Sequence, residues 1–169
     1  LHEQMVTLSG LADFNLDLGH LEAARDTALQ AIQIAQSRRE ISFETQSRRT
    51  LGTAYLRLGQ TLQGIRELKE ALRLGRQVGD VPAEASALVQ LGEAHLQTEQ
   101  FGLAQERFEE ALFLARQTEA LELEAQAYMG MGEVRGRRGD LPVARRFFAE
   151  AARLYDRHGD QDGKAWVLE

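Results

Sequence analysis

Residues 51–72 read LGTAYLRLGQTLQGIRELKEAL, and residues 91–112, 40 positions later, read LGEAHLQTEQFGLAQERFEEAL. The same offset brings residues 11–32 and 131–152 into register with both stretches. Four copies without an insertion or deletion indicate a tandem repeat, in which every copy folds alike and contacts its neighbours. The repeats are residues 1–40, 41–80, 81–120 and 121–160, and together they predict a single domain.

Each repeat is predicted to form two helices joined by a turn. In the third repeat one apolar helical face is marked by residues spaced i, i+4, i+7, i+8 and i+11, namely Ala104, Phe108, Ala111, Leu112 and Ala115. A glycine lies at the turn in three repeats, as is typical just past a helix end, and Glu99 takes that place in the third. The predicted helices span 4–18, 21–36, 42–58, 61–77, 82–98, 101–118, 121–138 and 141–157.

Small and large residues alternate at matching positions of the second helices. Small residues recur at Ala24, Gly64, Ala104 and Ala144, where they permit close helix approach. Phe108 lies in a column of larger residues and is predicted to be buried, with a loss of roughly 3–5 kcal/mol on truncation to alanine. A single hairpin cannot bury both of its faces, so we expect the hairpins to stack into an all-α solenoid.

These columns resemble the tetratricopeptide repeat (TPR) family. The family pattern of Leu-Gly-x-x-Tyr followed by Ala-x-x-x-Phe-x-x-Ala is matched by Leu51-Gly52-x-x-Tyr55 and by Ala104-x-x-x-Phe108-x-x-Ala111. The resemblance implies a right-handed α-solenoid of four helix-turn-helix hairpins. The usual period is about 34 residues, whereas 40 is similar to longer variants in bacterial regulatory and signalling proteins and in polarity adaptors. HEAT and armadillo repeats also run near 40 residues, but the glycine and alanine columns favour the TPR pattern.

The last nine residues, 161–169, continue the repeat pattern as part of a fifth first helix. Trp166, Val167 and Leu168 make this segment apolar. It is interpreted either as a cap on the fourth repeat or as an adhesive end through which the chain self-associates. Because the chain begins at Leu1 and stops within a repeat, we expect it to be a fragment of a longer protein.

Composition excludes several classes of function. The formal net charge is −6 with a pI near 5.3, which disfavours nucleic-acid binding. No apolar run reaches the roughly 20 residues that span a bilayer, so no membrane insertion is expected. The chain has no cysteine, which fits a reducing compartment, and a cytoplasmic location is predicted.

No arrangement of residues predicts catalysis, a metal site or a cofactor. The histidines lie in different places, and His95 occupies the column of Tyr55, which favours a packing or hydrogen-bonding role. The glycine-rich run from Gly130 to Gly139 lacks the strand and the Gly-Lys-Ser/Thr ending of a phosphate loop. Two of its glycines, Gly130 and Gly136, stand outside the glycine columns and are expected to weaken their helix, leaving the fourth repeat the loosest.

The family resemblance also implies where a partner would bind. In that family the first helices of successive hairpins line a concave groove that holds a peptide or a partner protein. The positions that correspond to the groove are mostly polar and form the predicted partner-binding site: Asp13, Gln46, Arg49, Thr53, Arg57, Gln90, Glu93, Gln97, Gln126, Glu133 and Arg137. The basic and asparagine-rich clamp of the chaperone-binding members is absent. The alternative is a solvated inner face without a ligand.

Charge alternates along the repeats. The second repeat has 7 Lys and Arg against 4 Asp and Glu, whereas the first has 3 against 6 and the third 2 against 7. This pattern would either steer a charged partner or hold adjacent repeats together. Three hypotheses follow: an interaction scaffold, a sensory or regulatory segment of a larger bacterial protein, and a homo-oligomerisation module that acts through the ends of the solenoid.

Overall fold

The computed structural model describes residues 2–158, and the helical segment expected at 161–169 lies outside these described residues. Helices form all of the regular secondary structure in the described part of the chain, which confirms the all-α repeat fold. Every predicted helix is present, with ends within two residues of the prediction. The helices are α1 (His2–Asp17), α2 (Leu21–Arg38), α3 (Ile41–Arg57), α4 (Thr61–Val78), α5 (Val81–Gln97), α6 (Phe101–Gln117), α7 (Leu121–Arg137) and α8 (Leu141–His158).

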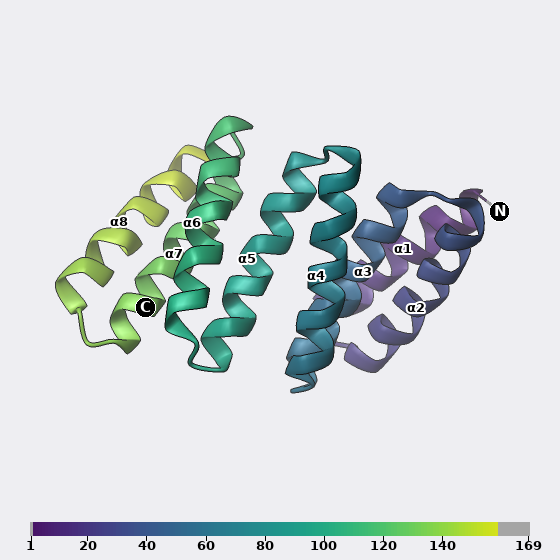
Figure 1. Cartoon of the computed structure of the whole chain (residues 1–169), viewed down its shortest axis with the longest axis horizontal. Helices are drawn as coiled ribbons and strands as arrows, with labels where there is room; N and C mark the ends of the chain where they lie inside the picture. The colour runs from purple at the N-terminus through teal and green to yellow at the C-terminus, as the bar shows by residue number, and fades with distance from the viewer. Residues whose placement is uncertain (1, 159–169) are drawn as a thin grey trace. The chain divides into compact units, whose positions relative to one another are not determined.

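The chain divides into two compact parts, an N-terminal half (Leu1–Ala87) and a C-terminal half (Leu88–Glu169), with the boundary inside α5. In the N-terminal half, α1 and α2 form one hairpin, α3 and α4 form the next, and α3 also contacts α1 and α2 (Figure 1). In the C-terminal half, α7 packs against both α6 and α8. Each first helix therefore contacts its own second helix and the hairpin before it.

The turns between helices repeat one hydrogen-bonding motif. At the end of α3, Gln60 N–H donates to Tyr55 C=O at 2.8 Å and Gly59 N–H donates to Leu56 C=O at 3.0 Å, with Gly59 at a φ of +75°. This is the Schellman motif, which satisfies carbonyls that a helix end leaves free. Glu99 adopts the same left-handed conformation without being glycine, at a φ of 57°. The repeat geometry therefore overrides the local preference of this residue.

Glycines on the first helices receive the large residues of the second helices. A Cβ on Gly92 would lie 2.6 Å from the ring of Phe108, and one on Gly52 would lie 2.7 Å from Leu68. Phe108 is fully buried, as the sequence predicted. Gly130 contacts the opposite part of the same ring, where a Cβ would approach to 2.3 Å. The interpretation of Gly130 as a mere weak point is therefore wrong, because its missing side chain makes room for Phe108.

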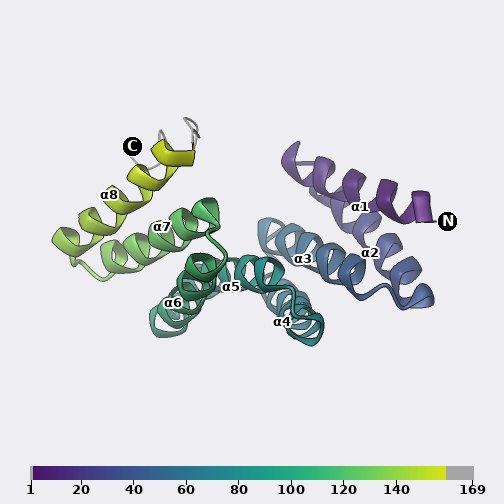
Figure 2. The ribbon, with the colours of Figure 1, turned by 90° about the horizontal axis from the view of Figure 1, so that it is seen from above.

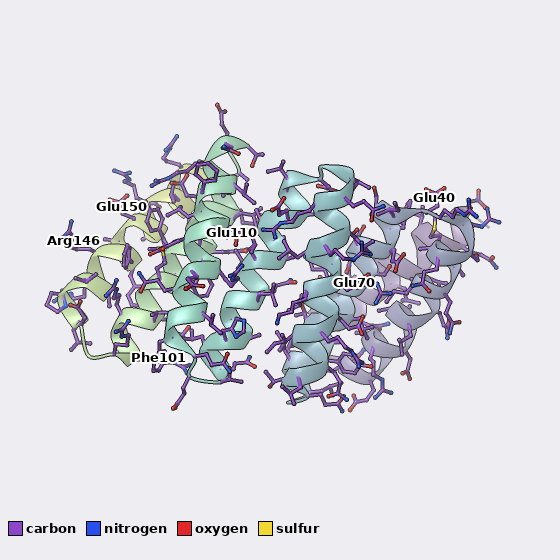
Figure 3. All side chains as sticks on the ribbon, in the orientation of Figure 1. Glu40, Glu70, Phe101, Glu110, Arg146 and Glu150 are labelled. Atoms are coloured by element: carbon purple, nitrogen blue, oxygen red, sulfur yellow. The ribbon has the colours of Figure 1, made fainter. Side chains whose placement is uncertain are left out.

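Equivalent ion pairs line the exposed faces of the second helices. Glu70, Glu110 and Glu150 occupy the same repeat position on α4, α6 and α8 (Figure 3). Each pairs with an arginine three residues away on its own helix, at 2.7, 2.8 and 2.9 Å respectively. These exposed pairs each contribute a few tenths of a kcal/mol to helix stability, about 0.2–0.5 kcal/mol. The outer faces are thus solvated helix surfaces, as the sequence indicated.

Candidate partner-binding face

All eleven predicted partner-binding residues lie on first helices, namely α1, α3, α5 and α7. Within the N-terminal half, α1 and α3 lie side by side (Figure 2). The structure brings several of the predicted residues together within each half, and others serve contacts between neighbouring helices. That they bind a partner remains a prediction.

Asp13 on α1 accepts hydrogen bonds from two residues of α3. Gln46 Nε2 donates to Asp13 Oδ2 at 2.8 Å, and the hydroxyl of Thr50 donates to Asp13 Oδ1. This half-buried cluster links successive first helices. Asp13 and Gln46 therefore have a structural role that sequence position alone did not reveal.

Arg49 on α3 extends toward α5. Its Nη1 donates to Ser86 Oγ at 3.1 Å. Around these two side chains lies a cleft of about 350 Å³, and Gln46 also lines it. Phe43 of α3 and Pro82 of α5 form part of its apolar wall. The sequence analysis identified Arg49 and Gln46 but missed Ser86 and Phe43, although Ser86 stands 40 residues after Gln46 and shares its repeat position.

Arg57 and Arg137 hold equivalent positions and make equivalent contacts. Arg57 Nη1 donates to the carbonyl of Leu16 near the end of α1, and Arg137 Nη1 donates to the carbonyl of Leu96 near the end of α5 at 3.3 Å. A cation at a helix C-terminus satisfies free carbonyls and interacts favourably with the helix dipole. These two arginines therefore join successive first helices, and part of their hydrogen-bonding capacity is already used.

Two carboxylates lie near each other on α5 and α7. Desolvation by surrounding protein atoms raises the pKa of Glu93 to about 7, and the negative charge of Glu133 adds to the effect. Glu93 is nevertheless exposed by its accessible surface, so water screens part of this shift. Glu133 is neutralised in part by Arg137, whose Nη2 lies 2.6 Å from Glu133 Oε1. Glu93 is thus the more readily protonated member of the pair.

The remaining predicted residues differ in their surroundings. The hydroxyl of Thr53 donates to the carbonyl of Arg49 at 3.1 Å, and Gln126 Nε2 donates to Glu122 at 3.2 Å. Gln90 Oε1 is buried without a hydrogen-bond partner. Gln97 is exposed at the last residue of α5. Apart from the orphaned Gln90 oxygen, these side chains can reach a ligand only by adding to or exchanging the contacts described.

No group of three or more histidine, aspartate and glutamate side chains within residues 2–158 could hold a metal ion. His95 is buried, and its Nδ1 lies 2.9 Å from Gln100 Oε1, which confirms a packing and hydrogen-bonding role. Across the described residues, no helix is long and apolar enough to cross a bilayer.

Several solved structures share this fold. Aspartyl phosphate phosphatase F from Bacillus subtilis superposes with a TM-score of 0.88 at 16% identity, covering 98% of this chain and 44% of that one. The Rap conjugation gene regulator of plasmid pLS20, solved in complex with the Phr* peptide, gives 0.74 at 17% identity, covering 93% and 49% of the two chains.

A signal-transduction ATPase from Pyrococcus horikoshii, described as having a tetratricopeptide repeat sensor, gives a TM-score of 0.75 at 18% identity, over 94% of this chain and 25% of that one. The chain thus spans half or less of the length of these three structures. No curated protein sequence matches it. Residues 43–117 match the family model of the tetratricopeptide repeat, and the chain that contains them is a tetratricopeptide-repeat protein.

Proposed function

We propose that this chain is a protein-interaction module that binds a peptide or a partner protein through the polar faces of its first helices, and that it is not an enzyme. The observation that carries the proposal is Arg49, a half-buried cation on α3 whose described partner is a neutral hydroxyl. The Phr* peptide complex of the Rap regulator supports a peptide as the kind of ligand. The absence of a recognisable catalytic arrangement in the sequence is consistent with binding alone.

The face is tested by capturing partners from a lysate of the source organism. The inner variant combines Gln97→Lys and Gln126→Lys on first helices, and the matched outer variant combines Gln33→Lys and Gln63→Lys on second helices. Both add the same charge. A partner bound by the wild type and the outer variant but lost from the inner variant would support the proposal. A partner retained by the inner variant would show that the first helices do not form the binding face.

A second candidate is a sensory or regulatory segment of a larger protein. It is favoured by the repeat sensor of the P. horikoshii ATPase, of which this chain would cover a quarter. Reading the coding sequence on both sides of the chain tests this candidate. A neighbouring nucleotide-binding or DNA-binding domain would support it, and a stop codon and a start codon directly at the two ends would contradict it.

A third candidate, homo-oligomerisation, is favoured by an exposed stripe on α1. Leu11, Phe14 and Leu18 are 44%, 58% and 53% exposed, although they follow the i, i+3, i+7 spacing of a packed face. At the matching position of Leu11, Leu51 on α3 is only 1% exposed. Phe14 stands where α3 carries Ala54.

Sedimentation over a range of protein concentrations tests this third candidate. Self-association that Phe14→Ser abolishes would support it, with Phe113→Ser, at an exposed phenylalanine of α6, as the matched control. A monomer at all concentrations would contradict it.

A further inference from the structure

We infer that the cleft between α3 and α5 around Arg49 binds a carboxylate group of the partner, next to one of its apolar side chains. This inference rests on the proposed binding function and adds the chemical class of the ligand. The cleft lies entirely within the N-terminal half.

The first step is the charge state of the cleft. Arg49 is half-buried, yet it forms no ion pair with any carboxylate of residues 2–158. Its neighbour Arg48, also partly buried, is held by Glu44 at 2.8 Å and Glu67 at 2.6 Å. Withdrawing a guanidinium from water is unfavourable unless an anion compensates for it. The structure therefore contains a cation that lacks its counter-ion, at the surface where a ligand could supply one.

The second step is the set of hydrogen-bond donors. A guanidinium carries five N–H groups in a planar fork that matches a carboxylate, and only one of them is used by Ser86. The Ser86 hydroxyl accepts that bond, so its own proton can be donated to a ligand. Ser42 lines the same cleft with a second hydroxyl. These groups together suit a planar anion with two acceptor oxygens.

The third step explains why the cleft's own acid does not fill this role. Asp80 lines the cleft, but its Oδ1 accepts a hydrogen bond from the backbone N–H of Ala83 at 3.0 Å and caps the N-terminus of α5. That position stabilises the carboxylate through the helix dipole. Asp80 also disfavours a doubly charged ligand, because a second negative charge would lie in the same cleft. A carboxylate is therefore preferred over a phosphate dianion.

The fourth step is the apolar wall. Phe43, Pro82 and Ala83 line the cleft beside the polar groups, and the volume of about 350 Å³ accommodates one or two amino-acid side chains. An acidic residue flanked by an apolar one fits both parts. The carboxylate could come from an aspartate or glutamate side chain or from a peptide C-terminus, and the same donors would bind either.

The experiment is an NMR titration of the whole chain with three small probes. They are N-acetyl-leucyl-aspartyl-leucine amide, its asparaginyl analogue and N-acetyl-leucyl-leucine with a free carboxyl terminus. The signals followed are the Nε–H group of Arg49 and the backbone amide of Ser86. The variants are Arg49→Gln, Arg49→Lys and, as a matched control on α8, Arg145→Gln, with circular dichroism showing equal helicity.

We expect the aspartyl probe to shift both signals and to bind about tenfold more tightly than the asparaginyl probe, because charge-assisted hydrogen bonds are the stronger ones. Arg49→Gln should abolish that difference, Arg49→Lys should retain part of it, and Arg145→Gln should leave it unchanged. Binding of the free acid alone would assign the site to a peptide C-terminus. Equal affinity for all three probes, or an aspartyl preference that survives in Arg49→Gln, would overturn the inference.

The outcome is separable from that of the proposed function. Capture of a partner through the first helices that does not depend on Arg49 would overturn the carboxylate site and leave the binding function in place. Failure of capture together with Arg49-dependent carboxylate binding would leave the site in place and count against a protein partner.

Discussion

At the scale of single residues, the repeat imposes one backbone and one packing scheme on positions that differ in sequence. Arg48 and Glu67 form an ion pair between α3 and α4, at positions where α7 and α8 carry Tyr128 and Phe147. The two aromatic rings are tilted, with centroids 6.0 Å apart. The same gap between first and second helix is thus filled by charge in one repeat and by aromatic packing in another. Substitutions are therefore best predicted from the neighbours that a repeat position meets.

The two additional glycines of α7 should respond oppositely to alanine. Gly130→Ala should destabilise the protein by about 1–3 kcal/mol, because the new Cβ would overlap the ring of Phe108. Gly136→Ala should stabilise it by up to about 1 kcal/mol, because its Cβ would meet Ala144 at an ordinary 3.9 Å. Urea denaturation followed by circular dichroism measures both changes. Equal effects of the two variants would contradict the packing argument.

The left-handed residue at the turn between α5 and α6 should be improved by glycine. Glu99→Gly should raise the free energy of unfolding by about 0.5–1 kcal/mol, because Glu99 holds a φ of 57° that disfavours a side chain. As a control, Glu106→Gly in the middle of α6 should lower it by about 1 kcal/mol. Thermal denaturation of both variants checks the prediction. A loss of stability in Glu99→Gly would show that its side chain makes a stabilising contact.

At the scale of helices, successive hairpins are joined by recurring polar contacts. Arg76 of α4 pairs with Glu84 of α5 at 2.7 Å, and Arg116 of α6 pairs with Glu124 of α7 at 2.9 Å. The carbonyl contacts of Arg57 and Arg137 join first helices in the same way. Polar residues of the repeat therefore specify how hairpins align, while the buried alanines and glycines set how closely they approach.

The contact between α5 and α7 should make stability depend on pH. The native pKa of Glu93, about 7, lies above its ordinary value of 4.5, so the folded protein binds this proton more tightly than the unfolded chain. Stability should therefore fall as the pH rises from about 4.5 through about 7. Glu93→Gln should remove this loss and be more stable than the wild type at pH 8.

Urea midpoints measured from pH 4.5 to pH 8 test that expectation. Glu106→Gln on α6 serves as the control and should keep the slope of the wild type. An unchanged slope in Glu93→Gln would show that Glu93 is ionised without penalty in the folded protein, as full access to water would allow.

At the scale of the whole molecule, the net charge changes sign between repeats. The basic second repeat, with 7 Lys and Arg against 4 Asp and Glu, follows and precedes acidic repeats. A partner that binds the first helices of the second repeat would be attracted by this charge. The same field contributes to attraction between adjacent repeats, so partner affinity and chain stability must be measured separately.

Binding of the captured partner should weaken with salt. Raising sodium chloride from about 50 to about 500 mM should lower the affinity several-fold, because the Debye length falls from roughly 14 to roughly 4 Å. Isothermal titration calorimetry measures the affinity, and circular dichroism at each salt concentration controls for unfolding. An affinity independent of salt would indicate an apolar contact in place of the charged one.

The sequence by itself determined the repeat, the eight helices and the burial of Phe108, because these follow from spacing within about 40 residues and from local turn chemistry. The turn positions were predictable for the same reason, including Glu99 in place of glycine. It also placed the candidate site on the first helices, which is a property of the repeat position and not of any particular neighbour.

Only the tertiary structure decided which polar side chains meet. Asp13 receives Gln46 from 33 residues away, Arg49 reaches Ser86 across 37, and Gly130 admits the ring of Phe108. These partners depend on the distance and rotation between stacked helices, which arise from many side chains packing at once. A sequence pattern names the face of a helix, and the packing of neighbouring helices determines which groups on that face remain free to bind.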